Sequence, residues 1–354
     1  MTLGDGCDQP LARLNIYLKF QTFLGLADYM PDLMPRVGTT APTMQVRMIE
    51  VTEAYEGQRL DNFLIRHCKG VPKSHLYKAV RGGQVRVNRG RCAVDYRLAL
   101  GDVVRIPPLR LPPADKPKAT PRRFEIVYQD DAILVINKPA GVAVHGGSGV
   151  SQGVIEALRA AHPQWPFLEL AHRLDRDTSG LLLLAKRRPA LVRLHEMMRG
   201  NQIDKRYVAL VQGRLANDRQ HVRAPLVKWL TASGERRVRV DAQGQQAHTV
   251  LTCLQRLGQY GVVQAQLHTG RTHQIRVHLA WLGHPILGDS KYGSDELAQA
   301  WRAIGVKRLF LHAHALSFTH PMTREPMALE APWPDEFHEM VAVLTAQAQP
   351  KGGK

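Results

Sequence analysis

The sequence predicts an α+β protein with a mixed, largely antiparallel sheet, preceded by a small α/β domain. Three observations support this fold class. The segment PPLRLPPADKPKATP, residues 107–121, carries six prolines and four charged residues, a composition typical of a semi-rigid linker. Before this linker, helical periods come first and short strands follow. After it, strand-like segments and turns succeed one another without the regular strand–helix repeat of a doubly wound sheet.

The overall composition is that of a globular protein with an unusual charge. The 354 residues are enough for two domains, and the apolar and charged fractions, 44% and 22%, are ordinary. However, 48 Lys and Arg stand against 31 Asp and Glu, which leaves a net charge of +17. Such an excess favours a polyanionic partner, above all nucleic acid, over a charge that serves solubility alone.

The cysteines and the hydropathy pattern indicate a cellular location. The cysteines form no C-x-x-C pair, so the sequence predicts neither a disulfide framework nor a thiolate zinc site. They are Cys7, Cys68, Cys92 and Cys253. Their scarcity fits a reducing cytosol. No segment reaches the roughly 18 uninterrupted apolar residues of a membrane span. We therefore expect a cytoplasmic protein that does not enter a membrane.

Residues 1–43 are expected to be a poorly ordered N-terminal extension. Their apolar stretch, residues 14–26, is interrupted by Asn15, Lys19 and Gln21. Acidic residues precede the stretch, unlike the basic start of a secretory leader. Met44 is an alternative start of the chain.

Residues 57–106 are predicted to form the small domain. In QRLDNFLIRHCKG, apolar residues such as Leu60 and Leu64 recur with helical period, and Gly70 ends the helix. A second helix follows in SHLYKAVRGG, with Ser74 as its expected N-cap. The segments QVRVNRGR and GDVVRI then have the pattern of short strands.

The small domain is also strongly basic, and its pattern resembles the S4 RNA-binding domain. The segments that carry the resemblance are QRLDNFL, GVPKSHLYKAVRGGQVRVN and GDVVRIP. In such domains a helix pair places basic side chains against RNA phosphates, contacts that position the protein and carry little sequence information. The alternative is a solvated basic face without a ligand. The expected RNA contacts are Lys73, Lys78, Arg81, Arg86 and Arg89.

The larger domain is expected over residues 122–345. FEIVYQDDAILVINKPAG predicts two strands around a turn at Asp130 and Asp131, and ALVRLHEMMRG predicts a helix that ends at Gly200. RYVALVQGRL has the pattern of an alternating strand. YGVVQAQLHTGRTHQIRVHLAWLG predicts a strand, a polar loop and a helix, and KRLFLHAHALSF predicts one more strand.

One stretch of this domain, AHRLDRDTSGLLLLAK, joins a charged turn to a run of four leucines. The run Leu181–Leu184 has the length of a buried strand, and residues 177–180 supply turn chemistry just before it. Asp175 would then lie on a loop anchored to a rigid sheet, where catalytic groups are often held. Taken alone, the stretch favours a charged surface turn that leads into a core strand over a catalytic loop.

The other polar clusters of the domain decide between these alternatives. They are NKPAGVAVH, KRYVAL, HTGRTHQIRVH and RLFLHA. Together with HRLDRDTSG, in this order and spacing, they resemble the pseudouridine synthases of the RluA type. The resemblance implies an enzyme that isomerises uridine to pseudouridine in RNA. It also implies 23S large-subunit ribosomal RNA, or a large-subunit assembly intermediate, as the partner. We expect the protein to act as a monomer.

The chemistry of this isomerisation explains the residue types. The N1–C1′ bond breaks, the uracil turns while bound, and C5 bonds to C1′, so no redox cofactor, metal or nucleotide is required. A glycosidase needs a second carboxylate to protonate its leaving oxygen, whereas uracil can leave as a delocalised anion. The resemblance assigns the single carboxylate to Asp175, which either adds to C1′ or removes a proton from C2′. Asp177 is expected to bind backbone N–H groups at the turn.

The resemblance also assigns the neighbours of Asp175. Arg271 is the cation expected to keep Asp175 ionised in a cleft that excludes water. Tyr207 is the aromatic residue expected to stack on the target uracil and help to remove its C5 proton. Arg173 would fill the space left by the flipped base. Leu311 is expected to form an apolar wall of the uracil pocket, and Arg276 to contact a phosphate.

Three alternatives to a pseudouridine synthase are less well supported by the sequence. A metal site could be sought among His273, His278, His312 and His314, but the first two are five residues apart and the last two lack an obvious carboxylate companion. A noncatalytic ribosome-binding factor would not need intact Asp175. A hydrolase of free nucleosides would have little use for a net charge of +17.

Overall fold

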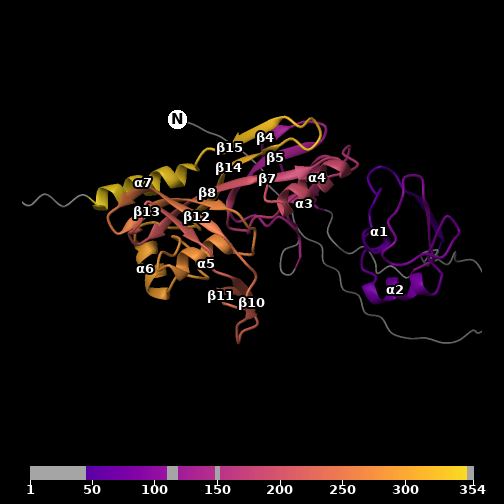
Figure 1. Ribbon diagram of the computed structural model, residues 1–354, viewed down its shortest axis with the longest axis horizontal. Helices are drawn as coiled ribbons and strands as arrows, with labels where there is room; N and C mark the ends of the chain where they lie inside the picture. Colours follow the sequence, from indigo (N-terminus) through magenta and orange to yellow (C-terminus); the bar gives the residue numbers. More distant parts are fainter. Residues whose placement is uncertain (1–44, 110–118, 148–151, 349–354) are drawn as a thin grey trace, which may run out of the picture. The chain divides into compact units, whose positions relative to one another are not determined.

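The computed structural model describes residues 45–109, 119–147 and 152–348 (Figure 1). The expected extension, residues 1–43, and the alternative start at Met44 lie outside these residues, as do residues 110–118 of the predicted linker. The described residues contain a small three-stranded sheet and a large ten-stranded sheet, each with its own helices. No helix in the described part of the chain is long and apolar enough to cross a bilayer.

The small domain packs two helices on an antiparallel sheet with the order β1-β3-β2. The two predicted helices and the two later strands are confirmed. The first strand was not predicted, because it lies upstream of the expected boundary at residue 57. The elements are β1 Arg47–Glu50, α1 Leu60–His67, α2 Lys73–Arg81, β2 Arg86–Val87 and β3 Val103–Ile106.

Helix α2 begins two residues earlier than its predicted N-cap, Ser74, would allow. Pro72 occupies the N-cap position and its carbonyl accepts from the backbone N–H of His75 at 3.0 Å, so Ser74 lies inside the first turn. The expectation that Ser74 caps the helix is therefore wrong. The two helices are joined by Asp61, which is buried and accepts from the Tyr77 hydroxyl at 2.8 Å. A buried carboxylate is tolerated there because it is fully hydrogen-bonded.

The large sheet follows the order β4-β5-β7-β14-β8-β13-β12-β9, with β15 paired to β14 and β6 paired to β7. Only β7 and β14 pair in parallel, so the sheet is mixed and largely antiparallel, as predicted. Its strands are β4 Glu125–Gln129, β5 Ile133–Lys138, β6 Glu169–Leu170, β7 Ser179–Ala185, β8 Asp204–Gln212, β9 Arg219–Val222, β12 Thr249–Leu257, β13 Tyr260–Leu267, β14 Leu311–Thr319 and β15 Pro326–Glu330.

Both faces of this sheet are covered. Leu182 and Leu184 of β7 belong to one hydrophobic core, and Leu181 and Leu183 belong to another, which is why the strand is apolar at every position. Strand β8 is buried from Tyr207 to Val211, and all five residues belong to the core that contains Leu182 and Leu184, so its predicted alternation is wrong. The helices of the domain are α3 Val154–Ala161, α4 Arg188–Arg199, α5 Gln274–Trp281, α6 Asp295–Ala303 and α7 Asp335–Ala348.

A glycine sets the start of β7. Gly180 has φ +106, and a Cβ atom there would lie 2.2 Å from the carbonyl oxygen of Ala313. Gly180 and Ala313 are paired in the parallel register of β7 and β14. Only glycine permits this approach, and the approach places the loop before β7 against the start of β14.

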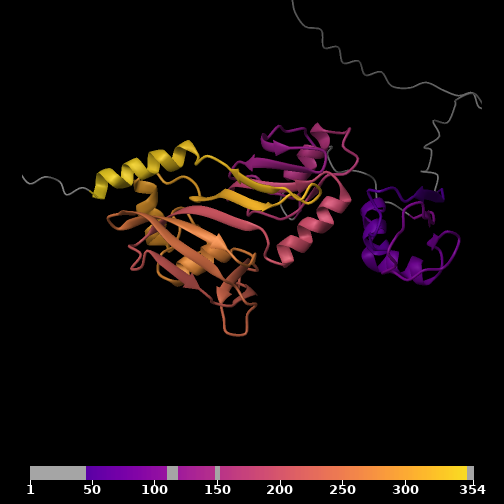
Figure 2. The same ribbon diagram turned by 45° about the horizontal axis from the view of Figure 1, so that its top comes forward.

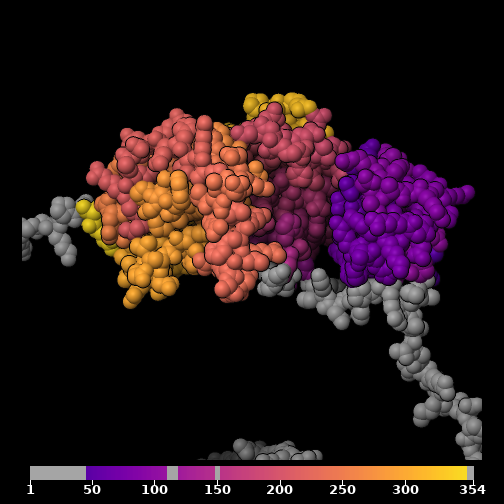
Figure 3. All heavy atoms as spheres, turned by 60° about the horizontal axis from the view of Figure 1, so that its bottom comes forward, coloured from indigo at the N-terminus to yellow at the C-terminus, as the bar shows by residue number. Residues whose placement is uncertain are grey.

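A separate hairpin, β10 Leu226–Leu230 and β11 Arg236–Val240, leaves the main sheet. It projects from the domain in both ribbon views (Figures 1 and 2). In the space-filling view the same segment, coloured salmon, stands out at the surface (Figure 3). The sequence interpretation assigned no element to these residues.

Candidate active site

A cavity of about 550 Å³ lies where three parts of the large domain meet. The loop before β7 supplies Arg173 and Asp175, and β8 supplies Tyr207. The segment from the end of β13 into α5 and the first residue of β14 close the remaining sides. All six residues expected around the target uridine line this cavity: Arg173, Asp175, Tyr207, Arg271, Arg276 and Leu311.

The loop that carries Asp175 is hydrogen-bonded to Lys138, the last residue of β5. Its ammonium group donates to three carbonyl oxygens, those of Pro139 at 2.8 Å, Val142 at 2.9 Å and Arg176 at 3.0 Å. Burial lowers the pKa of Lys138 to about 7, although the charges of Asp177 and Asp175 work in the opposite direction. The motif NKPAG does not by itself indicate a role for this lysine.

Asp175 forms an ion pair with Arg276. The two side chains approach to 3.2 Å, between Nη1 of Arg276 and Oδ2 of Asp175, and they are 6% and 19% exposed. Arg276 also donates from Nε and Nη2 to the two oxygens of the buried Asp289, at 2.7 Å each. Burial opposes the charge of Arg276, but Asp289 and Asp175 outweigh it and raise the pKa of the guanidinium. One fixed cation is thus shared by two carboxylates.

This arrangement corrects two expectations about the arginines. Arg271, the expected partner of Asp175, is exposed, and its Nε donates to the carbonyl of Gln246 at 3.1 Å. Arg276, the expected phosphate contact, is buried and held by carboxylates instead. The reason is local: α5 begins at Gln274, so Arg276 lies in its buried first turn while Arg271 remains in the preceding loop.

Tyr207 lies in the wall of the cavity beside Asp175. It is buried, and burial together with the charge of Asp175 raises the pKa of its hydroxyl, so the phenol is protonated at neutral pH. Leu311 is also buried, whereas Arg173 is exposed at the mouth. An aromatic face, an apolar wall and an exposed arginine around one carboxylate suit a flat, uncharged ring next to a sugar.

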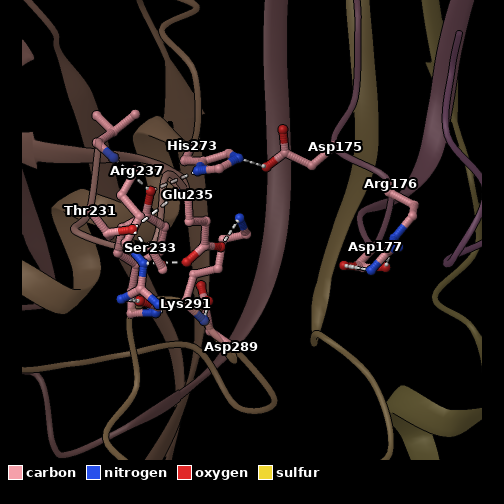
Figure 4. Close-up of polar contacts among 12 residues, drawn as sticks. Asp175, Arg176, Asp177, Thr231, Ser233, Glu235, Arg237, His273, Asp289 and Lys291 are labelled. Atoms are coloured by element: carbon pink, nitrogen blue, oxygen red, sulfur yellow. Dashed lines mark hydrogen bonds and ion pairs between the residues drawn. The ribbon is translucent and has the colours of Figure 1, made fainter. Parts of the chain in front are cut away.

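Asp177 is not where the sequence interpretation expected it to act. Its oxygens accept from the Arg176 guanidinium, at 3.1 Å for the shorter contact, and the side chain is 41% exposed. Figure 4 shows this pair on the other side of the loop from Asp175. The expected binding of backbone N–H groups is absent from the hydrogen bonds of the described residues.

The histidines weighed as metal ligands face different partners. His278 bonds Thr249 and the carbonyl of Ala224, and His312 bonds Ser179 at 2.9 Å. His273, by contrast, lines the cavity beside Asp175. The sequence interpretation missed this position, and it missed Asp289 and Tyr292 in GDSKYG, where the only signal was an acidic and an aromatic residue in a turn.

In the small domain, the five basic residues expected to contact RNA are all exposed. Arg89 has φ 68 at the tip of the turn after β2, and its carbonyl accepts from Arg86 at 3.4 Å. Lys73, Lys78 and Arg81 lie on α2. Their side chains are available to a partner, but no contact in the structure tests their role.

Comparisons with known proteins show the family of the chain. A family profile described as RNA pseudouridylate synthase matches residues 132–281, and an S4 domain profile matches residues 58–104. The chain is 47% identical over 320 residues to a Yersinia pestis protein named ribosomal large subunit pseudouridine synthase C, which covers 88% of this chain and 99% of that protein. The Escherichia coli K12 protein of the same name is 49% identical over 301 residues, 82% of this chain and 94% of that protein.

A solved structure shares the fold of the larger part. The human protein titled RNA Pseudouridylate Synthase Domain Containing 4 has a TM-score of 0.52 and 27% sequence identity to this chain. The match covers 62% of this chain and 92% of the human one.

Proposed function

This chain belongs to the RluA-type RNA pseudouridine synthases with an N-terminal S4 domain, and we propose that it isomerises specific uridines of 23S large-subunit ribosomal RNA with Asp175 as the catalytic carboxylate. The observation that carries the proposal is the ion pair between Asp175 and Arg276 inside a cavity of about 550 Å³. Among the described residues that line this cavity, Asp175 is the only carboxylate, and the reaction requires only one.

The isomerisation neither adds nor removes an atom, because every bond that breaks and forms lies within the nucleotide. The N1–C1′ bond breaks with its electron pair on uracil, the uracil turns, C5 bonds to C1′, and the proton on C5 moves to N1. Asp175 acts at the sugar, either by adding to C1′ or by removing a proton from C2′ that is later returned. Arg276 bonds the carboxylate at 3.2 Å and fixes its position relative to the sugar.

The remaining residues of the cavity are assigned to the base. Tyr207 offers an aromatic face for stacking and a protonated hydroxyl that can take up the C5 proton only as it passes its own proton on. Leu311 forms the apolar wall. Arg173, exposed at the mouth, takes the place of the flipped nucleotide in the RNA, which offsets part of the cost of a few kcal/mol for unstacking.

The substrate assignment rests on the relatives and on charge. The relatives from Yersinia pestis and Escherichia coli K12 are named for the ribosomal large subunit. The net charge of +17 and the exposed basic residues of the small domain suit a long polyanion. We propose that the protein works in the cytoplasm as a monomer, on free rRNA or on an assembly intermediate in which the target loops are still accessible.

Release of tritium from RNA labelled at C5 of uridine tests the activity, because the isomerisation leaves the mass unchanged. Asp175→Asn should abolish release and keep RNA affinity within a few-fold of the wild type. Asp177→Asn is the matched control, since Asp177 is half-exposed and pairs only with Arg176 in the described residues. Turnover by Asp175→Asn near the wild-type rate would overturn the assignment.

The target is identified separately. Carbodiimide labelling with primer extension on rRNA from a deletion strain should lose specific stops that the intact gene restores. Under matched salt, naked rRNA or an assembly intermediate should be modified faster than the mature subunit, because a flipped base must come from an accessible region. Modification of transfer RNA alone would overturn the substrate and leave the catalytic assignment intact.

A further inference from the structure

His273 has an unusual backbone conformation directly beside Asp175. It is in the left-handed region, at φ 54 and ψ 20, at the N-cap of α5. Such a conformation is uncommon for residues other than glycine and frequently marks a functional constraint. Here it places the imidazole between two groups. Nε2 lies 3.7 Å from Oδ2 of Asp175, and Nδ1 lies 2.7 Å from the hydroxyl of Tyr292.

The hydrogen bonds around Tyr292 favour one tautomer of this imidazole, because Nδ1 of His273 is the acceptor that the described residues offer to the Tyr292 hydroxyl. The backbone N–H of Val238 donates to the Tyr292 oxygen at 3.2 Å. Burial raises the pKa of Tyr292 to about 12, so the phenol keeps its proton at neutral pH. With its oxygen already accepting from Val238, Tyr292 donates that proton to Nδ1 of His273. A neutral imidazole that accepts at Nδ1 carries its own hydrogen on Nε2.

We propose that His273 is a positioning residue for Asp175, held by Tyr292 in the tautomer that directs an Nε2–H group at the catalytic carboxylate. The proposal deepens the function proposed above and rests on it. Arg276 and His273 both approach Oδ2 of Asp175, from opposite ends of the first turn of α5. Arg276 bonds Oδ2 at 3.2 Å, whereas His273, at 3.7 Å, lies just beyond hydrogen-bond distance. Catalytic contacts are often long without substrate and shorten when it binds, so His273 is placed to become the second donor that fixes the rotation of the carboxylate and leaves Oδ1 for the sugar of the target uridine.

The hairpin β10–β11 holds Tyr292 in place. Besides the contact from Val238, Arg237 donates to the carbonyl of Lys291 at 3.0 Å, and Glu235 accepts from both Arg237 and Lys291. Figure 4 shows this polar cluster on the side of His273 that faces away from Asp175. The tyrosine that sets the tautomer is therefore anchored to a projecting element, and its hydroxyl cannot turn away without breaking the contact with β11.

The charges around His273 leave it neutral. Burial lowers its pKa, and the cations Arg276 on α5 and Lys291 on the following loop act in the same direction. Asp175 and Asp289 act in the opposite direction but do not outweigh burial. The imidazole is therefore uncharged at neutral pH, as the hydrogen-bond direction requires. Protonation at lower pH would turn Nδ1 into a donor and reverse the contact with Tyr292.

The tautomer can be observed without any substrate. Long-range ¹H–¹⁵N spectra of the full-length protein labelled in histidine distinguish a protonated Nε2 from a protonated Nδ1, and His273→Gln identifies the signals of this residue. We expect Nε2–H in the wild type and a shift toward Nδ1–H in Tyr292→Phe. Nδ1–H in the wild type, or an unchanged tautomer in Tyr292→Phe, would overturn the proposal. This measurement is independent of activity, so it separates the tautomer from the proposed function.

Two replacements of His273 test what the tautomer does. Gln carries an amide N–H near the position of Nε2, whereas Asn tolerates the left-handed conformation but does not reach Asp175. His273→Asn should lower kcat by roughly 10- to 100-fold, the value of a lost bond to a charged group, with KM nearly unchanged. His273→Gln should recover most of kcat. The decrease of kcat at low pH that protonation of His273 causes should be absent from this variant. Equal kcat for both variants would overturn the proposal.

A double-mutant cycle tests the link to Tyr292. Tyr292→Phe should lower kcat in the wild type and have little further effect in His273→Gln, because the amide offers no Nδ1 acceptor. Tyr260→Phe is the control, since Tyr260 is also buried and its hydroxyl accepts from Gln259 at 3.3 Å on a strand end outside the cavity lining. Additive effects of Tyr292→Phe and His273→Gln on kcat would show that the two residues act separately. This would overturn the proposal that Tyr292 acts through His273.

Discussion

Nη1 of Arg276 lies 3.2 Å from Oδ2 of Asp175, while its other two nitrogen atoms, Nε and Nη2, both donate to the buried Asp289. A cation held in this way cannot follow a moving carboxylate, because turning toward one partner means leaving the other. Asp289 therefore fixes the position of the Arg276 guanidinium that pairs with Asp175. Breaking such a buried pair at one end commonly costs about 3–5 kcal/mol, since a buried carboxylate is left without a partner.

The first prediction separates the two arginines of HTGRTHQIRVH. Arg276→Lys keeps one charge but lacks the planar fork that bonds both carboxylates, so kcat should fall by roughly 10- to 100-fold. Arg271→Ala should lower kcat less, since Arg271 bonds the Gln246 carbonyl and forms no ion pair with Asp175 in the described residues. Equal losses of kcat in the two variants, measured by tritium release, would contradict the assignment.

The sequence was sufficient to find the catalytic loop but not to choose between these arginines. A run of four leucines after a turn predicts a strand buried on both faces, and Asp175 follows from its position before that strand. Arg271 and Arg276 belong to one motif, and which of them faces inward depends on the residue at which α5 begins. Helix starts are the least certain part of a sequence-based prediction because caps are local and weak.

The hairpin and the GDSKYG turn were missed for a different reason. In β10 and β11 only Leu226 and Val238 are buried, so the segment lacks the sustained alternation that marks a strand against a core. Asp289 and Tyr292 reach the site only because their turn folds back onto α5, where they contact Arg276 and His273. No periodic pattern in the sequence relates the turn to α5. Their roles could not be predicted from spacing.

The second prediction concerns Gly180. Gly180→Ala forces a Cβ atom against the carbonyl of Ala313 and strains a φ of +106, so it should destabilise the fold by more than about 3 kcal/mol and disturb the Asp175 loop. Gly234→Ala is the matched control, since its φ is also positive, at +78, with no atom within 4 Å of the added Cβ. It should cost only about 1 kcal/mol. Similar urea midpoints for the two variants would show that the approach of β7 and β14 tolerates a side chain.

The third prediction uses the salt dependence of RNA binding. Replacing the exposed basic residues of the small domain with Gln should weaken binding to rRNA and flatten the plot of log affinity against log salt by somewhat under one unit for each lost phosphate contact. The activity of the bound complex should remain. The residues are Lys73, Lys78, Arg81, Arg86 and Arg89. A salt slope identical to that of the wild type would mean that these side chains do not meet phosphates.

The last prediction follows from Lys138, whose pKa burial lowers from 10.5 to about 7. Because the folded pKa lies below the unfolded one, the unfolded chain binds more protons between about pH 7 and 10.5, and the contribution of Lys138 to stability increases with pH in that window. Lys138→Met removes the ionisable group together with its three bonds to carbonyl oxygens. The difference in unfolding free energy between wild type and Lys138→Met should therefore move in favour of the wild type from about pH 7 to pH 9.

Urea unfolding of both proteins at the two pH values measures this difference, and other titrating groups largely cancel because they are common to both chains. A difference that does not change with pH would mean that the carbonyls of Pro139, Val142 and Arg176 keep the ammonium charged throughout, as strong acceptors can. The lysine would then serve as a permanent cation beneath the Asp175 loop, and loss of activity in Lys138→Met should be the same at both pH values.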